Sequence, residues 1–150
     1  MSELITTALV DLDLQGSERG EATANLVARL AAEGRVTDES GFMTAIRDRE
    51  AQMPTGIEGG IGIPHARSEY VTEPTLAFGR STNGVDFGSA DGPADLIFLI
   101  AAPDGGGSEH MKILASLARR LVRESFRSAL RGASTPQDVV DLVNKEVLGR

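Results

Sequence analysis

Apolar and polar positions along the chain predict helices toward both ends and strands mainly in the middle. Residues 8–14 alternate between apolar and polar side chains, as a half-buried strand does. Residues 75–81 have the composition of a strand, and Asn83-Gly84 is a typical hairpin turn leading to residues 85–87. Residues 95–102 are the most apolar segment, which predicts a strand covered on both faces.

Apolar side chains at helical spacing predict two helices before the central strands. Ser17 is expected to cap the first, and Gly34 to end it. Thr37-Asp38-Glu39 opens the second with a capping residue and acids in its first turn. The second helix carries Phe42, Ala45, Ile46 and Arg49 at positions i, i+3, i+4 and i+7. Arg49 is therefore expected to continue the buried stripe of this helix.

Three further helices are predicted after the most apolar strand. Ser108 is expected to cap the first, whose inward stripe consists of His110, Leu114, Leu117 and Leu121. A short helix is expected over residues 124–130. Thr135 followed by Pro136 gives a cap and a proline at the first helical position, which predicts the start of the last helix.

The order of these elements predicts an α+β fold, a three-layer α/β/α sandwich with helices on both faces of a mixed central sheet. The predicted hairpin does not fit a purely alternating, doubly wound order. No internal repeat, low-complexity tract or linker interrupts the sequence. Residues 1–150 are therefore expected to form a single domain, large enough to bury a core without disulfides or metals.

Composition narrows the possible functions. The net charge of -7 disfavours nucleic acid as a partner, because its phosphates require basic patches. No apolar run is long enough to cross a bilayer, and no basic segment followed by an apolar core precedes the first strand, so neither membrane insertion nor secretion is expected. The chain has no cysteine, which removes thiol chemistry and weakly favours the cytoplasm.

One stretch holds a histidine on a stiff backbone. In residues 59–65 three glycines permit close approach of other atoms, and Pro64 restricts the backbone immediately before His65. One interpretation is a hydrogen-bonded histidine at the surface beside a tight turn. The other is a nucleophile or general base, since imidazole is substantially neutral at pH 7 and a rigid segment would orient it.

His110 and Arg49 are the other two candidate site residues. His110 lies near the start of a helix after a strand and three glycines, where free N–H groups favour an anion; alternatively it is a histidine at the edge of the core. Arg49 either stabilises the end of its helix or turns inward to meet a phosphate or carboxylate. Nucleotide-binding motifs and a G-x-S-x-G elbow are absent from the sequence, and two histidines make zinc unfavourable, so no cofactor or metal is expected.

Several segments together resemble the fructose/mannitol-type enzyme IIA domain (EIIA type 2) of the phosphoenolpyruvate-dependent sugar phosphotransferase system. The run T-G-x-x-x-G-I-x-I-P-H ends at His65, and a second run, H-x-x-x-L-x-x-L-A-R, begins at His110. The similarity also covers residues 49–54, 73–80, 84–87 and 95–103, and so extends over nearly the whole chain. Ala66-Arg67 after His65 and the glycines before His110 favour fructose-type members over the nitrogen-related branch.

The resemblance implies that His65 accepts a phosphoryl group from the carrier HPr and passes it to a cysteine of a IIB component. IIB in turn serves the membrane component IIC. By the same resemblance, His110 is a supporting residue and Arg49 stabilises the phosphoryl group, with no cofactor or metal. Two alternatives stay open. One is a nitrogen-type regulatory protein controlled by phosphorylation, and the other is a sensory module that is never phosphorylated.

Overall fold

The computed structural model describes residues 3–105 and 109–149; the side chains of Glu109 and His110 also lie outside the described part. Its helices and strands follow one another along the chain as η1 (Thr7–Leu9), β1 (Val10–Asp11), α1 (Arg19–Ala32), α2 (Glu39–Gln52), β2 (Gly56–Ile57), β3 (Ile61–Gly62), β4 (His65–Ser68), β5 (Thr75–Val85), β6 (Ala94–Pro103), α3 (Glu109–Leu121), α4 (Glu124–Gly132) and α5 (Pro136–Glu146).

The strands form one mixed sheet organised around β6. Its order is β1-β5-β6-β3-β2, and β4 also pairs with β6. The β5–β6 and β2–β3 pairs are antiparallel, whereas β3 and β4 run parallel to β6 and β1 runs parallel to β5. Because β3 and β4 pair with successive parts of the same strand, the segment that joins them follows the edge of β6.

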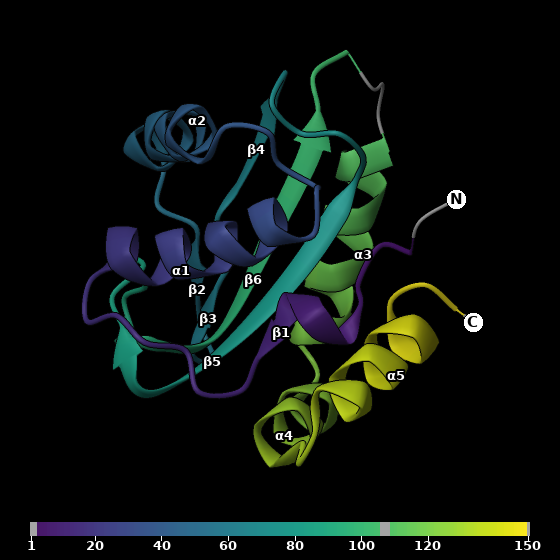
Figure 1. The fold of residues 1–150 in the computed structure, drawn as a ribbon. Coiled ribbons are helices and arrows are strands. Elements are labelled where there is room, and N and C mark those ends of the chain that lie inside the picture. The colour runs from purple at the N-terminus through teal and green to yellow at the C-terminus, as the bar shows by residue number, and fades with distance from the viewer. Residues whose placement is uncertain (1–2, 106–108, 150) are drawn as a thin grey trace.

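Helices cover both faces of this sheet, which confirms the predicted three-layer α/β/α arrangement (Figure 1). Alternate residues of β5 and β6 supply the two cores. Leu76, Phe78 and Phe98 pack with α3, α4 and α5. Ala77 and Leu99, one position along, pack with α1 and α2 on the other face. The period of two along each strand therefore divides the apolar side chains between two helical layers.

Several helix boundaries agree with the sequence. Asp38 caps α2 by accepting a hydrogen bond from the Gly41 N–H, and Gly34 follows α1 with a φ of 73°. Thr135 and Asp138 form a reciprocal capping box at the start of α5. Ser17, in contrast, does not cap α1. The N-cap residue is Glu18, and the Ser17 hydroxyl donates to the Glu21 carboxylate instead.

Two strand predictions are wrong. Residues 8–14 contribute only Val10–Asp11 to the sheet, because a 3-10 turn occupies Thr7–Leu9 and β1 pairs only with β5. Asn83-Gly84 is not a hairpin turn. β5 continues through it to Val85, which pairs with Ala94, and the register shifts between Arg80 and Val85. Gly84 has a φ of 80°, and this left-handed conformation falls at the register shift within β5.

The predicted cap at Ser108, and Gly106-Gly107 before it, lie outside the described residues. α3 begins at Glu109, after the end of β6. None of the helices in the described ranges has the length and apolar content needed to span a membrane.

Candidate functional site

His65 is the first residue of β4 and is half-buried. Its Nδ1 lies 2.8 Å from the carbonyl oxygen of Ile63. A carbonyl oxygen can only accept a hydrogen bond, so Nδ1 carries the ring proton in the neutral form. The unprotonated nitrogen is then Nε2, and its lone pair is available as a nucleophile.

The backbone around His65 is anchored on both sides. The Ile63 N–H donates to the Thr55 carbonyl at 3.2 Å, and the Pro64 carbonyl accepts from the Ile100 N–H at 3.0 Å. His65 itself pairs with Ile100 of β6. The carbonyl that orients the imidazole is therefore fixed by the sheet and by Thr55, which lowers the entropic cost of a productive ring orientation.

Glu50 supports this arrangement from α2. Its carboxylate accepts hydrogen bonds from the Thr55 N–H at 3.3 Å and from the Thr55 hydroxyl. It also pairs with the Arg19 guanidinium of α1 at 3.0 Å, although its own side chain is only 9% exposed. A buried carboxylate requires such partners. Together these contacts connect α1, α2 and the segment that carries His65.

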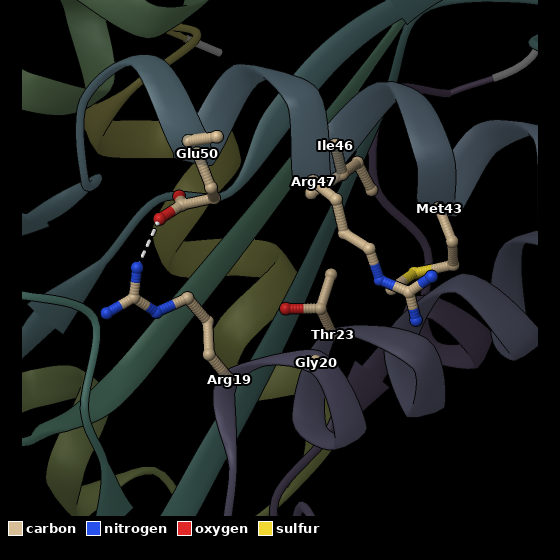
Figure 2. A pocket seen from close by; sticks show the side chains of 8 residues that line it. Arg19, Gly20, Thr23, Met43, Ile46, Arg47 and Glu50 are labelled. Carbon is tan, nitrogen blue, oxygen red and sulfur yellow. Dashed lines mark hydrogen bonds and ion pairs between the residues drawn. The ribbon is translucent and has the colours of Figure 1, made fainter.

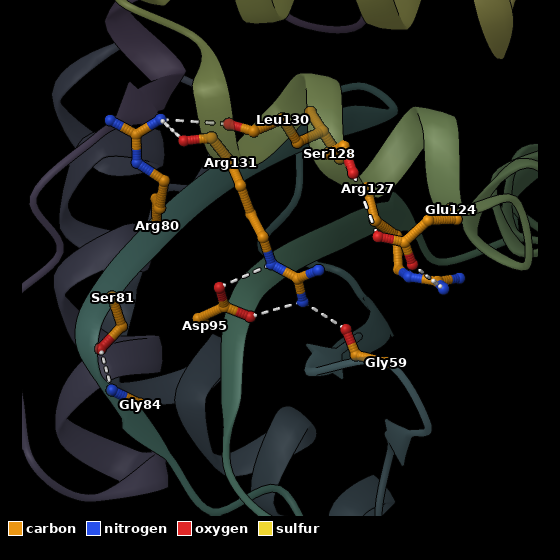
Figure 3. A network of polar contacts seen from close by, with 10 residues as sticks. All are labelled: Gly59, Arg80, Ser81, Gly84, Asp95, Glu124, Arg127, Ser128, Leu130 and Arg131. Atoms are coloured by element: carbon orange, nitrogen blue, oxygen red, sulfur yellow. Dashed lines mark hydrogen bonds and ion pairs between the residues drawn. The ribbon is translucent and has the colours of Figure 1, made fainter.

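A second polar network anchors the glycine-rich segment before His65 (Figure 3). Arg131 of α4 pairs with the Asp95 carboxylate through Nε at 2.8 Å and through a terminal nitrogen at 2.9 Å. The same guanidinium donates to the Gly59 carbonyl. The hydrogen bond to Asp95 raises the pKa of Arg131 above its usual value. The Gly60 carbonyl accepts from the N–H groups of Asp95 and Leu96, both at 3.0 Å.

Arg49 lies in the last turn of α2, the helix that packs against β4. The residue is half-buried, and the guanidinium donates to the Met53 carbonyl at 3.3 Å. The expectation that Arg49 continues the buried stripe is therefore wrong. Phe42, Met43, Ile46 and Glu50 are the residues that α2 buries, so Glu50 takes that place. Arg49 instead lies at the edge of the buried face, where its guanidinium is hydrogen-bonded to the Met53 carbonyl.

His110 is the second residue of α3, and its side chain lies outside the described part. β4 pairs with the last residues of β6, and α3 starts shortly after β6 ends. Figure 1 shows the first turn of α3 at that end of the sheet. The topology therefore brings the backbone of His110 to the end of the sheet where β4 and β6 terminate. Among the described residues, no group of three or more His, Cys, Asp or Glu side chains is placed to hold a metal ion.

A family model described as "Phosphoenolpyruvate-dependent sugar phosphotransferase system, EIIA 2" matches residues 3–146 of this chain. The chain belongs to this family. The resemblance seen in the sequence is thus confirmed, and the chain is a phosphocarrier of the EIIA type, a phosphotransferase protein with a phosphohistidine intermediate.

Two curated relatives are similar over nearly the whole chain. The fructose-specific EIIA component of Haloferax volcanii is 36% identical, and the alignment covers 98% of this chain and 96% of that protein. The fructose-specific EIIABC component of Bacillus subtilis is 38% identical over 97% of this chain. This chain spans only 23% of the length of the EIIABC protein.

Solved structures share the fold. The nitrogen regulatory protein IIA-Ntr from Neisseria meningitidis has a TM-score of 0.85 and 26% identity, covering 93% of this chain and 96% of that one. Enzyme IIA for mannitol from Escherichia coli, in its complex with phosphorylated enzyme IIB, has a TM-score of 0.79 and 25% identity, covering 97% and 98%. The mixed sheet with helices on both faces is therefore the family's architecture.

Proposed function

We propose that this EIIA chain carries its phosphoryl group on Nε2 of His65, receiving it from phosphorylated HPr and passing it to a cysteine of a IIB component. The observation that carries the proposal is the 2.8 Å hydrogen bond between His65 Nδ1 and the Ile63 carbonyl, which leaves Nε2 unprotonated. The anchored backbone on either side of His65 supports the same assignment.

Each transfer is a substitution at phosphorus. In the first, the Nε2 lone pair forms a bond to phosphorus as the N–P bond to the donor histidine breaks. The ring gains positive charge, and the Ile63 carbonyl that accepts from Nδ1 stabilises it. In the second, a thiolate of IIB attacks the phosphorus, the S–P bond forms, the Nε2–P bond breaks and His65 returns to its neutral form.

Charge on the phosphoryl oxygens must be offset without trapping the group. In phosphoryl transfer the protein contributes mainly positioning and electrostatic stabilisation. Arg49 is suited to electrostatic stabilisation, because it lies on the helix that packs against β4. Among the described residues its guanidinium has one hydrogen bond to exchange, to the Met53 carbonyl. We assign His110 the supporting role, at the start of α3.

Two exposed methionines lie close in sequence to the candidate site residues Arg49 and His110, and we expect protein partners to dock there. Met53, directly after α2, has 64% of its surface exposed, and Met111 in the first turn of α3 has 54%. Exposed methionines suit a surface that packs against more than one partner, because their side chains adapt to different shapes. The solved complex of the related mannitol enzyme IIA with phosphorylated IIB supports IIB as the acceptor.

Fructose is the proposed sugar of the transporter that this chain serves, because relatives at 36% and 38% identity are named fructose-specific. We accordingly place the chain in the cytoplasm as a single domain, serving a membrane IIC component through IIB. The alternative, a nitrogen-type regulatory protein, is supported by the fold similarity to IIA-Ntr, but the sequence identity there is 26%.

The test is labelling with phosphoenolpyruvate, enzyme I and HPr. The parent chain should gain an acid-labile phosphate that His65→Ala does not accept. His110→Ala should still accept phosphate and transfer it slowly to IIB. Labelling of His65→Ala to the parent level would refute the site, and a chain that takes no label under any donor would be the sensory module. Transfer to a panel of purified IIB domains then distinguishes fructose from other sugars and from the regulatory alternative, which predicts no efficient acceptor.

A further inference from the structure

A cavity of about 190 Å³ lies between α1 and α2, on the face of the sheet opposite α3, α4 and α5 (Figure 2). Met43, Ile46 and Ala51 form its apolar side, and Arg19, Thr23, Arg47 and Glu50 are its polar and charged lining residues. The proposed phosphoryl transfer uses neither its interior nor Arg47.

Thr23 leaves a polar atom unsatisfied in the wall of this cavity. The residue is only 2% exposed, and its hydroxyl has no hydrogen-bond partner within the described part of the chain. Figure 2 shows the hydroxyl directed into the space between the two helices. A buried hydroxyl without a partner costs free energy, so its position favours a bound molecule that supplies a hydrogen bond.

The charges of the cavity leave one cation unmatched. The Arg19 guanidinium pairs with Glu50 at 3.0 Å and donates from Nε to the Asp86 carbonyl at 2.9 Å. Arg47 is exposed, and its guanidinium has no hydrogen-bond or ion-pair partner among the residues that the structure describes. Arg19 also lies 3.8 Å from the Asp86 carboxylate, so its charge is already matched. The unpaired charge at the cavity is that of Arg47, which one anionic group would neutralise.

The size of the cavity limits the ligand. A cavity of about 150 Å³ holds one benzene molecule, so this space suits on the order of eight heavy atoms. The ligand must combine an anionic end for Arg47, a hydrogen-bonding group for Thr23 and a short apolar body for Met43 and Ile46. We propose that the cavity binds a small 2-hydroxycarboxylate with a branched aliphatic side chain.

The cavity shares Glu50 with the support of His65. Glu50 lines the space and also accepts hydrogen bonds from Thr55. A ligand in the cavity is therefore expected to perturb the Thr55 amide as well as amides of the lining residues.

The test is an NMR titration of the unphosphorylated, ¹⁵N-labelled chain with 2-hydroxyisovalerate, so that its outcome does not depend on phosphoryl transfer. Saturable shifts are expected at Gly20, Thr23, Ala51 and Thr55. The uncharged amide, 2-hydroxyisovaleramide, should bind at least about tenfold more weakly, because it lacks the charge-assisted hydrogen bond to Arg47.

Variants separate the site from nonspecific binding. Arg47→Gln should weaken binding about tenfold, whereas Arg123→Gln, at an exposed arginine before α4, should leave it unchanged. Gly20 also lines the cavity, and Gly20→Leu should abolish binding by filling it. Apart from its chain neighbours and its own helix backbone, no atom of the described residues lies within 4 Å of a Cβ placed at Gly20. Far-UV circular dichroism checks that each variant is folded.

Three results would overturn the proposal. The first is shifts that do not saturate, which would mean that the cavity holds only water. The second is equal binding of 2-hydroxyisovalerate by the parent and by Arg47→Gln. The third is inorganic phosphate that binds at the same amides as tightly as 2-hydroxyisovalerate.

Discussion

Gly62 of β3 is expected to tolerate no side chain, because of its contact with the Phe87 ring. A Cβ at Gly62 would lie 2.6 Å from Phe87 Cγ and 2.7 Å from Cδ2, whereas ordinary van der Waals contact begins at 3.4 Å. Gly62 does not have a positive φ, so backbone strain does not contribute. Gly62→Ala therefore isolates a steric effect three residues before His65.

Phe87 has little room to move away from the added methyl group. It is fully buried in the core beneath α1 and α2, and the Arg19 guanidinium lies over its ring at 5.6 Å. Its carbonyl accepts from the Gly56 N–H at 2.9 Å, which fixes its backbone. Overpacking of this kind costs about 2 kcal/mol. For a chain of this length, the melting temperature should fall by about 4–8 °C.

Urea denaturation followed by circular dichroism measures this loss, with Phe87→Leu as the partner variant. Phe87→Leu alone is destabilising, but it should recover at least about 1 kcal/mol in the Gly62→Ala background by making space. The control is Gly132→Ala at the end of α4, where a Cβ would meet no atom within 4 Å. It should be neutral or slightly stabilising. A Gly62→Ala chain as stable as the parent, or a loss that Phe87→Leu does not reduce, would refute the steric argument.

Three further predictions concern the site and its surroundings. Arg49→Gln should slow transfer from His65 to IIB on the order of tenfold to hundredfold, through loss of charge stabilisation, with little change in stability; an unchanged single-turnover rate would contradict the role of Arg49. Asp91 has a pKa lowered first by the Ser89 hydroxyl and then by the Gly59 N–H, so an NMR pH titration of Ser89→Ala should show that pKa rising toward its ordinary value. Because the pKa of Asp91 is lower in the folded than in the unfolded chain, its ionised carboxylate stabilises the fold above the unfolded pKa, and this stabilisation is lost as the pH falls through the folded pKa. An unaltered Asp91 titration in Ser89→Ala would contradict the role of the Ser89 hydroxyl. Thr135→Ala should lower the free energy of unfolding by about 1 kcal/mol, because the cap on α5 is lost. Urea denaturation measures this loss, and no change would mean that the capping box does not stabilise the helix.

The helices were predictable because their causes are local. Asp38 and Thr135 cap helices whose apolar positions recur at the helical spacing, and Gly34 ends α1 in a left-handed conformation. The buried strand β6 was predictable from its continuous apolar run, since both faces are covered. In these segments local preference and tertiary packing favour the same structure.

The errors arose where tertiary pairing overrides local chemistry. Asn83-Gly84 has the composition of a hairpin turn, but β6 offers pairing up to Ala94, and β5 accommodates the extra residues as an irregularity. The chain reverses direction after Val85 instead. Residues 8–14 have the alternation of a strand, yet only Val10–Asp11 find a partner in β5.

At the candidate site, the sequence predicted the rigid mounting of His65 but not its support. Glycines and Pro64 are visible in the sequence, whereas the contacts of Glu50 with Arg19 and Thr55 join segments that only the fold brings together. Glu50 lies four residues after Ile46 and so falls on the buried face of α2. This spacing was the clue in the sequence that Glu50 points inward. Hydrogen bonds from Arg131 to Asp95 and Gly59 have no comparable clue, since they connect positions 36 and 72 residues apart.

The most direct test of the account is the identity of the nitrogen that carries phosphate. In the phosphorylated chain with ¹⁵N-labelled histidine, NMR should show phosphorus coupled to Nε2 of His65, with Nδ1 still protonated and hydrogen-bonded to the Ile63 carbonyl. Coupling of phosphorus to Nδ1, or to a nitrogen of His110, would contradict the account.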